Sequence, residues 1–219
     1  DFVACHNPSF LEKYDMLSNL KPGGTFLLTS SHGPEEVWDT LPVEVQQQII
    51  DKKIKFYVID AFRIAEEVGL GNRINVIMQT AFFKISSVID IDQAVKAIKD
   101  AIKKTYGKKG EKIVQMNFAA VDQALEKVYQ VKVPSKATSR IHMAKIVPDD
   151  APEFVRTVTA EIMAGRGDKL PVSKMPCDGK FPTGTTQYEK RNIAVYIPVW
   201  EPQLCLQCGQ CSFVRPHAA

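Results

Sequence analysis

The sequence predicts an α/β fold, with an open and mostly parallel sheet flanked by helices, followed by an extended connector and a short cysteine-bearing segment. Three observations predict it. Short apolar runs alternate with amphipathic, helix-length segments as far as residue 130. Residues 167–187 are rich in proline, glycine, threonine and lysine and offer little to bury. Three cysteines then crowd into residues 205–211.

The strands are expected at three short apolar runs, residues 2–5, 25–29 and 55–59. A strong turn sequence, Lys-Pro-Gly-Gly, separates the first two runs. Strand–helix–strand order at this spacing favours parallel neighbours, because the intervening helices carry the chain back along a face of the sheet.

Helices are expected between and after these strands. Pro42 introduces one helix, Gly69 ends another in the usual C-terminal manner, and Asp90 or Asp92 caps a third. The predicted helical ranges are residues 9–20, 43–53, 61–68, 74–88 with Asn72 as its cap, the amphipathic stretch 94–102, and 113–128.

The character of the chain changes near Val131. Residues 131–150 carry two prolines, several charges and no clear period, which indicates a linker. Residues 151–164 predict a short amphipathic helix, and residues 167–187 an extended connector. Residues 191–200 alternate between apolar and polar side chains and predict a strand with one face buried.

The bulk composition excludes several classes of protein. Of 219 residues, 45% are hydrophobic and 24% charged, which is typical of a globular domain. The net charge of +3, without a basic patch interleaved with aromatic residues, argues against nucleic acid as a partner. No apolar run is long enough for a membrane span, and no signal peptide opens the sequence. The chain begins within an apparent strand and without a methionine, so we expect a segment of a longer polypeptide.

Cysteine spacing gives the strongest chemical signal. Cys205, Cys208 and Cys211 form a C-x2-C-x2-C run, and Pro216 follows it. Bacterial ferredoxins bind [4Fe–4S] clusters through C-x2-C-x2-C-x3-C-P, in which a tight turn places three thiolates around one face of the cluster. Arg215 stands at the position of the fourth cysteine. Since that cysteine serves the other cluster of two-cluster ferredoxins, the first cluster keeps these three ligands and takes its fourth from a second motif.

Two alternatives to an iron–sulfur cluster stay open. A zinc site would need a fourth ligand, for which His217 is available at a spacing unusual for zinc. The three thiols could also carry no metal. The odd total of five cysteines argues against a disulfide framework and favours a reducing cytoplasm, and we interpret Cys5 and Cys177 as plain thiols.

Weaker signals each have a plain structural alternative. The loop of residues 30–33, Ser-Ser-His-Gly, follows a predicted strand at the edge where α/β sheets bind ligands, so it is either a phosphate or thioester-carrier contact or a solvated loop. Gly69 and Gly71 follow a helix instead of a strand, which favours a helix end over a nucleotide loop. Lysines gather at positions 103, 104, 108, 109 and 112, either as a solvated helix end or as a surface for an acidic redox partner.

Together these segments resemble the pyruvate:ferredoxin (flavodoxin) oxidoreductase family. The resemblance rests on several motifs in order, namely FVACHNPSFL at 2–11, LKPGGTFLL at 20–28, KFYVIDAFRIAEEVGLGNRINVIM at 55–78, QTAFF at 79–83, TYGKKGEKI at 105–113, MNFAAVD at 116–122, EKR at 189–191 and the segment 200–219. It implies a partial gamma-type domain over residues 1–133, a linker with the EKR segment over 134–200, and the truncated start of a [4Fe–4S] ferredoxin domain over 201–219.

The resemblance also implies an activity for the parent protein. It would decarboxylate pyruvate oxidatively to acetyl-coenzyme A and CO2, using thiamine diphosphate and Mg2+ held outside this segment, and pass electrons through [4Fe–4S] clusters to ferredoxin or flavodoxin. A homodimer in the cytoplasm, joined to the remaining domains of the enzyme, is the implied assembly. We expect this segment alone to be inactive. The alternatives are an enzyme for another 2-oxoacid, or a non-catalytic scaffold that binds coenzyme A and docks a partner.

Overall fold

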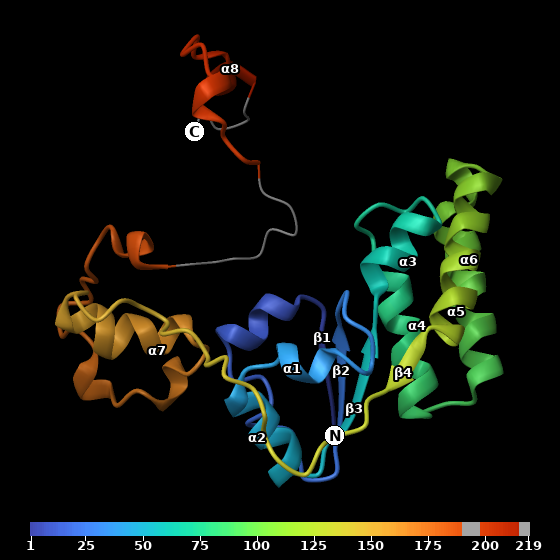
Figure 1. Cartoon of the computed structure of the whole chain (residues 1–219), viewed down its shortest axis with the longest axis horizontal. Helices are drawn as coiled ribbons and strands as arrows, with labels where there is room; N and C mark the ends of the chain where they lie inside the picture. Colours follow the sequence, from blue (N-terminus) through green and yellow to red (C-terminus); the bar gives the residue numbers. More distant parts are fainter. Residues whose placement is uncertain (190–197, 215–219) are drawn as a thin grey trace.

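The computed structural model describes residues 1–189 and 198–214. Its centre is a four-stranded sheet in the order β1–β2–β3–β4 (Figure 1). The strands β1 (Phe2–Cys5), β2 (Thr25–Thr29) and β3 (Lys55–Ile59) are parallel, whereas β4 (Val128–Gln130) runs antiparallel to β3. The predicted open, mostly parallel sheet with flanking helices is therefore confirmed, and β4 is an additional strand that the sequence did not predict.

Apolar side chains cover both faces of the sheet, as a central parallel sheet requires. On one face, Phe26 stacks on Phe56 with ring centroids 5.4 Å apart, and this core includes Cys5 and Trp38. On the other face, Leu27 packs in a second core with residues of the later helices. Alternation along each strand sends successive side chains to opposite cores.

Helices form a layer on each side of the sheet (Figure 1). Over the face that carries Phe26 and Phe56 lie the 3₁₀ turn η1 (Pro8–Glu12) and the helices α1 (Val37–Thr40) and α2 (Val43–Asp51). The other layer contains α3 (Ala61–Glu67), α4 (Asn75–Ser86), α5 (Ile91–Tyr106), the 3₁₀ turn η2 (Gly107–Lys109) and α6 (Glu111–Glu126).

Most predicted helix ends agree with local capping chemistry. Gly69 takes a left-handed φ of +81° after α3, and the 6→1 bond from Leu70 N–H to the Ala65 carbonyl completes the C-terminal motif. Asp90 caps α5 by accepting bonds from two backbone N–H groups. Two predictions were wrong: Asn72 does not cap α4, which begins after Ile74, and only Pro8–Glu12 of the predicted helix 9–20 is helical, as a 3₁₀ turn.

The region 131–150 forms no helix or strand, as predicted for a linker, yet it is fastened to the body. We call residues 137–144 the strap. Backbone N–H groups of Thr138 and Ser139 both donate to the buried side-chain oxygen of Gln46, at 2.8 and 2.9 Å. The strap then passes the start of α2, where the Ile141 carbonyl accepts a bond from the Val43 N–H at 2.8 Å.

A small separate core follows the strap. The predicted helix 151–164 is a π-helical turn, η3 (Val155–Thr159), that continues into α7 (Ala160–Met163). Three 3₁₀ turns follow, η4 (Gly167–Lys169), η5 (Val172–Lys174) and η6 (Thr185–Tyr188). The predicted strand 191–200 lies outside the described residues except for 198–200, which form no strand.

The last described segment contains η7 (Pro202–Leu204) and the short helix α8 (Gln210–Val214). In the part of the chain that the structure describes, no helix combines the length and the apolar character needed to cross a bilayer.

Candidate functional site

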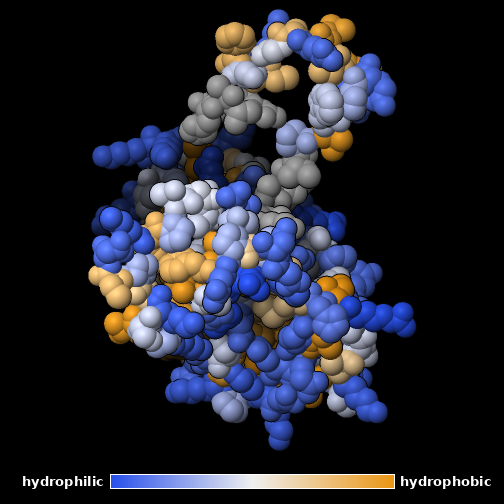
Figure 2. Space-filling model, turned by 90° about the vertical axis from the view of Figure 1, so that its left-hand side faces the viewer, coloured by the Kyte–Doolittle hydropathy of each residue, from blue (hydrophilic) through white to orange (hydrophobic). Residues whose placement is uncertain are grey.

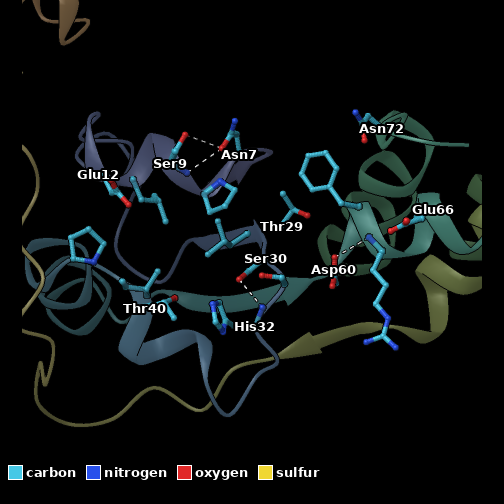
Figure 3. A pocket seen from close by; sticks show the side chains of 18 of the residues that line it. Asn7, Ser9, Glu12, Thr29, Ser30, His32, Thr40, Asp60, Glu66 and Asn72 are labelled. Atoms are coloured by element: carbon cyan, nitrogen blue, oxygen red, sulfur yellow. Dashed lines mark hydrogen bonds between the residues drawn. The ribbon is translucent and has the colours of Figure 1, made fainter. Parts of the chain in front are cut away.

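A large cavity lies at the carboxyl ends of the three parallel strands and has a volume of about 860 Å³. Open α/β sheets bind ligands at this edge, because the loops that follow each strand converge there. We call it the strand-end cavity. Figure 3 shows that most of its labelled side chains come from η1 and Asn7 before it, from the loop after β2, and from α3 and its cap, while Thr40 comes from the end of α1 and Asn72 from the loop after α3.

On the η1 side, local hydrogen bonds fix the polar side chains. The Asn7 side-chain oxygen accepts bonds from the backbone N–H of Ser9 at 3.1 Å and from its hydroxyl at 2.9 Å. Asn7 thereby caps η1, which begins at Pro8, a residue suited to a first helical position. The side chain of Glu12 reaches the cavity from the end of the same turn.

The predicted loop of residues 30–33 supplies the second wall. The Ser30 hydroxyl accepts a bond from the backbone N–H of His32 at 3.1 Å, and the Ser30 N–H donates to the Ile59 carbonyl at 3.0 Å. This bond uses the backbone of His32 and not its imidazole. The imidazole lies 3.8 Å from a carboxylate oxygen of Glu36 instead.

The third wall comes from the start of α3. Asp60 caps this helix by accepting a bond from the Arg63 N–H at 3.0 Å, and Phe62 contributes an aromatic ring. Thr29 Oγ1 accepts a bond from the Ala61 N–H at 3.2 Å, which fixes α3 against the end of β2. Further lining residues are apolar, namely Leu11, Leu28, Leu41, Pro8 and Pro42.

This arrangement suits binding more than covalent chemistry. The walls offer hydroxyls, two side-chain amides and apolar surface, a mixture typical of small-molecule sites. Carboxylates of Glu12, Asp60 and Glu66 outnumber the cationic Arg63, so the cavity itself does not concentrate negative charge from a ligand.

The three cysteines of the predicted cluster site are all exposed. Between them, Gln207 and Gly209 have left-handed φ values of +54° and +72°, which curl the chain within the motif. A hydrogen bond from the Trp200 indole, followed by one from the Gln207 backbone, lowers the pKa of the Cys205 thiol.

The donor chemistry fits an iron–sulfur cluster, because thiolates at this spacing are the ligands that such clusters use. The described residues contain no group of three His, Cys, Asp or Glu side chains close enough to hold a metal, so the three sulfurs are not gathered in one place. Arg215, at the position of the fourth cysteine, and His217, the alternative zinc ligand, lie outside the described residues.

Comparison with known proteins decides the family. Residues 1–127, more than half of the chain, match the family model described as "Pyruvate ferredoxin/flavodoxin oxidoreductase". The chain belongs to this family. Residues 140–194 match a second model, EKR, described as a domain of unknown function.

Curated relatives in this family match the whole chain. The pyruvate:ferredoxin oxidoreductase of Moorella thermoacetica is 55% identical over 219 residues, which are 100% of this chain and 19% of that protein. The putative pyruvate-flavodoxin oxidoreductase of Synechocystis is 50% identical over 219 residues, covering 100% of this chain and 18% of that protein. The chain therefore spans about a fifth of the length of these relatives. A solved pyruvate oxidoreductase subunit, PORC from Thermotoga maritima, aligns with a TM-score of 0.46 at 16% identity, over 60% of this chain and 65% of that one.

In this family member, the strand-end cavity is lined partly by a loop that the sequence predicted and partly by residues that it did not. The predicted serine and histidine of the loop after β2 line the cavity, together with the unpredicted Asn7 and Phe62. A signal for both existed, since each closely follows a predicted strand. Gly69 ends a helix as favoured, and the lysines at 103–112 lie exposed along the end of α5, η2 and the start of α6.

Proposed function

We propose that this chain is part of an enzyme that oxidatively decarboxylates pyruvate to acetyl-coenzyme A and CO2 and delivers the electrons to ferredoxin or flavodoxin. One observation carries the proposal: the chain is 55% identical, over all 219 residues, to a protein named pyruvate:ferredoxin oxidoreductase. Thiamine diphosphate and Mg2+ would bind elsewhere in the parent enzyme, and we assign no residue of this chain to them. The segment alone would not catalyse the reaction.

Within that reaction, we assign the strand-end cavity to the pantetheine arm of coenzyme A. The arm carries two amides and alkyl groups, which match the polar side chains of Asn7 and Ser30 and the apolar Leu41 and Phe62. The acidic residues of the lining place the negatively charged phosphates of coenzyme A outside this cavity. The residues of the chain would bind and orient the arm and exclude water from it.

Calorimetry on the parent enzyme tests this assignment. Phe62→Ala should weaken coenzyme A binding about tenfold, because it removes a large apolar contact from the cavity wall. Phe181→Ala is the matched control, since Phe181 is half exposed and does not line the cavity. Equal affinity for coenzyme A in both variants would show that the coenzyme does not bind in this cavity. If the unaltered enzyme does not bind coenzyme A at all, the alternative of a structural module is favoured.

We further propose that Cys205, Cys208 and Cys211 hold one [4Fe–4S] cluster, which would supply one-electron transfer when bound. The C-x2-C-x2-C spacing and the thiolate donors support this assignment. After anaerobic reconstitution, the Cys208→Ser variant of the parent enzyme should contain about four iron and four sulfide ions fewer than the unaltered enzyme. Cys177→Ser is the control, as that exposed thiol lies outside the motif. Stoichiometric zinc without sulfide would refute the cluster.

The remaining assignments follow from the same proposal. We divide the chain into a partial gamma-type domain at 1–133, a linker with the EKR segment at 134–200, and the start of a ferredoxin domain at 201–219. A cytoplasmic homodimer is the proposed assembly. Reduction of ferredoxin that depends on both pyruvate and coenzyme A in the purified parent enzyme is the decisive assay. Activity with a different 2-oxoacid alone would favour the alternative substrate.

A further inference from the structure

Residues 144–189, which we call the connector unit, are attached at both ends to the same short turn, η1. The backbone N–H of Ala144 donates to the Glu12 carbonyl at 2.9 Å, and the Lys13 ammonium lies 3.4 Å from a carboxylate oxygen of Glu189. Glu12 and Lys13 are neighbours at the end of η1. Residues 145–188 therefore leave the body and return to it at one place, although 176 positions separate Lys13 from Glu189.

Between these two attachments the unit packs on itself. Val147, Val155 and the small side chains of Ala151 and Ala160 form a buried core, and Tyr188, next to Glu189, packs against it. An ion pair between Arg166 and Glu161, with Nε to Oε2 at 2.7 Å, ties the end of α7 to the following turn. The two ends of the unit are thus joined through one small core.

The contact with the body is electrostatic. The Lys13 and Glu189 side chains are only 11% and 27% exposed, and the Lys13 ammonium also lies 5.4 Å from the centre of the Tyr14 ring. Across the same contact, the pKa of Arg166 is raised, mainly by hydrogen bonds to Glu161 and in smaller part by the Asp15 carboxylate. Figure 2, which looks onto this side of the molecule, shows a mainly hydrophilic surface with separate apolar patches.

The ion pair between Lys21 and Asp1 does not share this burial. Lys21 and Asp1 approach to 3.3 Å with side chains 75% and 83% exposed, and such surface pairs contribute little stability. Lys13 and Glu189 are partly removed from water, so breaking the pair leaves a charge with reduced solvation and costs more.

We propose that residues 144–189 act as a clamp on η1, with Lys13 as the positioning residue that fixes the point from which the chain continues to the cysteine motif. Two attachments restrict the movement of the unit more than one attachment would. From Glu189 to Cys205 the chain reaches at most about 55 Å, so the position of Glu189 limits where the cluster can lie. This assignment rests on the proposed cluster at Cys205, and it gives the EKR region a role, since the matched model covers residues 140–194.

Charge reversal in the full-length enzyme tests the clamp. The variants are Lys13→Glu, Glu189→Lys and the double reversal, with Lys21→Glu as the matched control on an exposed pair. Hydrogen exchange of the peptides that contain Ala144 and Glu189 should become about fivefold to tenfold faster in each single variant, because local opening becomes easier. The double reversal should return exchange to within about twofold of the original rate, and the control should leave it unchanged.

A second readout separates positioning from a merely structural contact. The rate at which pyruvate and coenzyme A reduce the iron–sulfur clusters should fall in both single variants and recover in the double reversal, while KM for pyruvate stays constant. Unchanged exchange in the single variants, or no recovery in the double reversal, would overturn the clamp. Faster exchange with unchanged cluster reduction would overturn the positioning role. A parent enzyme that pyruvate does not reduce at all would instead refute the proposed function, and the exchange data would still decide the clamp.

Discussion

Replacing Gln46 with leucine should loosen the strap at Thr138 and Ser139. The Gln46 side chain is fully buried; its nitrogen donates to the Trp38 carbonyl at 2.6 Å, and its oxygen accepts from the N–H groups of Thr138 and Ser139. Leucine has a similar size and keeps the apolar packing but makes none of these three bonds. The two N–H groups would then stay unpaired until the strap lifts and water reaches them.

The expected magnitude follows from those two bonds. Each contributes about 1 kcal/mol net, so opening of the strap should become about 2 kcal/mol easier, roughly a 30-fold rise in the open fraction. The Trp38 carbonyl loses its bond from Gln46 but still accepts one from the Leu41 N–H at 3.2 Å, so this loss lowers the overall free energy of unfolding by about 1 kcal/mol more.

Hydrogen exchange of the peptide that contains Thr138 and Ser139 measures this opening directly. Gln47→Leu is the matched control, since this neighbour is exposed and bonds only to Asp51 on its own helix, at 2.8 Å. We expect the control to change the stability by less than about 0.5 kcal/mol. Equal strap exchange in the two variants would show that the Gln46 bonds do not hold the strap.

Three further changes test local features. Gly69→Ala should lower the free energy of unfolding by about 1–2 kcal/mol, because φ is +81° and the new methyl group would lie 2.9 Å from a methionine side chain. In Gly71→Ala the new methyl group meets no atom, so the loss should be smaller. Thermal unfolding compares the two variants. Asp90→Ala should lower helix stability by about 1 kcal/mol, seen as faster exchange in the first turn of α5, because the side chain caps two N–H groups. Burial raises the pKa of Cys5 to about 11, so the folded state favours the protonated thiol and loses stability as pH rises from about 9 to 11. Iodoacetamide at pH 8 should therefore label the exposed Cys177 and spare Cys5.

Local patterns predicted the three parallel strands and most helix ends, because alternation and capping are encoded within a few residues. β4 escaped prediction because the apolar period of α6 runs up to Val128 without a break, and only three residues form the strand. The strap escaped for a different reason. Gln46 bonds to residues 92 and 93 positions away, and no pattern within either segment reports such a contact.

The strand-end cavity was partly predictable by the same logic. The loop after β2 was recognised because polar residues directly follow an apolar run. Asn7 follows β1 in the same way, but a helix predicted at residues 9–20 concealed the turn that positions it. The cysteine motif, in contrast, is visible in the sequence, but among the described residues its three side chains are not close enough together to hold a metal. Its chemistry depends on a cluster and a fourth ligand that local folding does not supply.

The turn η1 connects the strand-end cavity with the clamp, because different groups of the same residues contact each of them. Ser9 and the Glu12 side chain face the cavity, while the Glu12 carbonyl and the Lys13 ammonium hold the clamp. Changes to the Glu12 side chain therefore act on the cavity and keep the clamp bond, which the backbone makes. Changes to Lys13 act on the clamp and leave the cavity lining intact. Since η1 has only five residues and Lys13 directly follows it, a displacement of this turn would affect the cavity and both clamp attachments together.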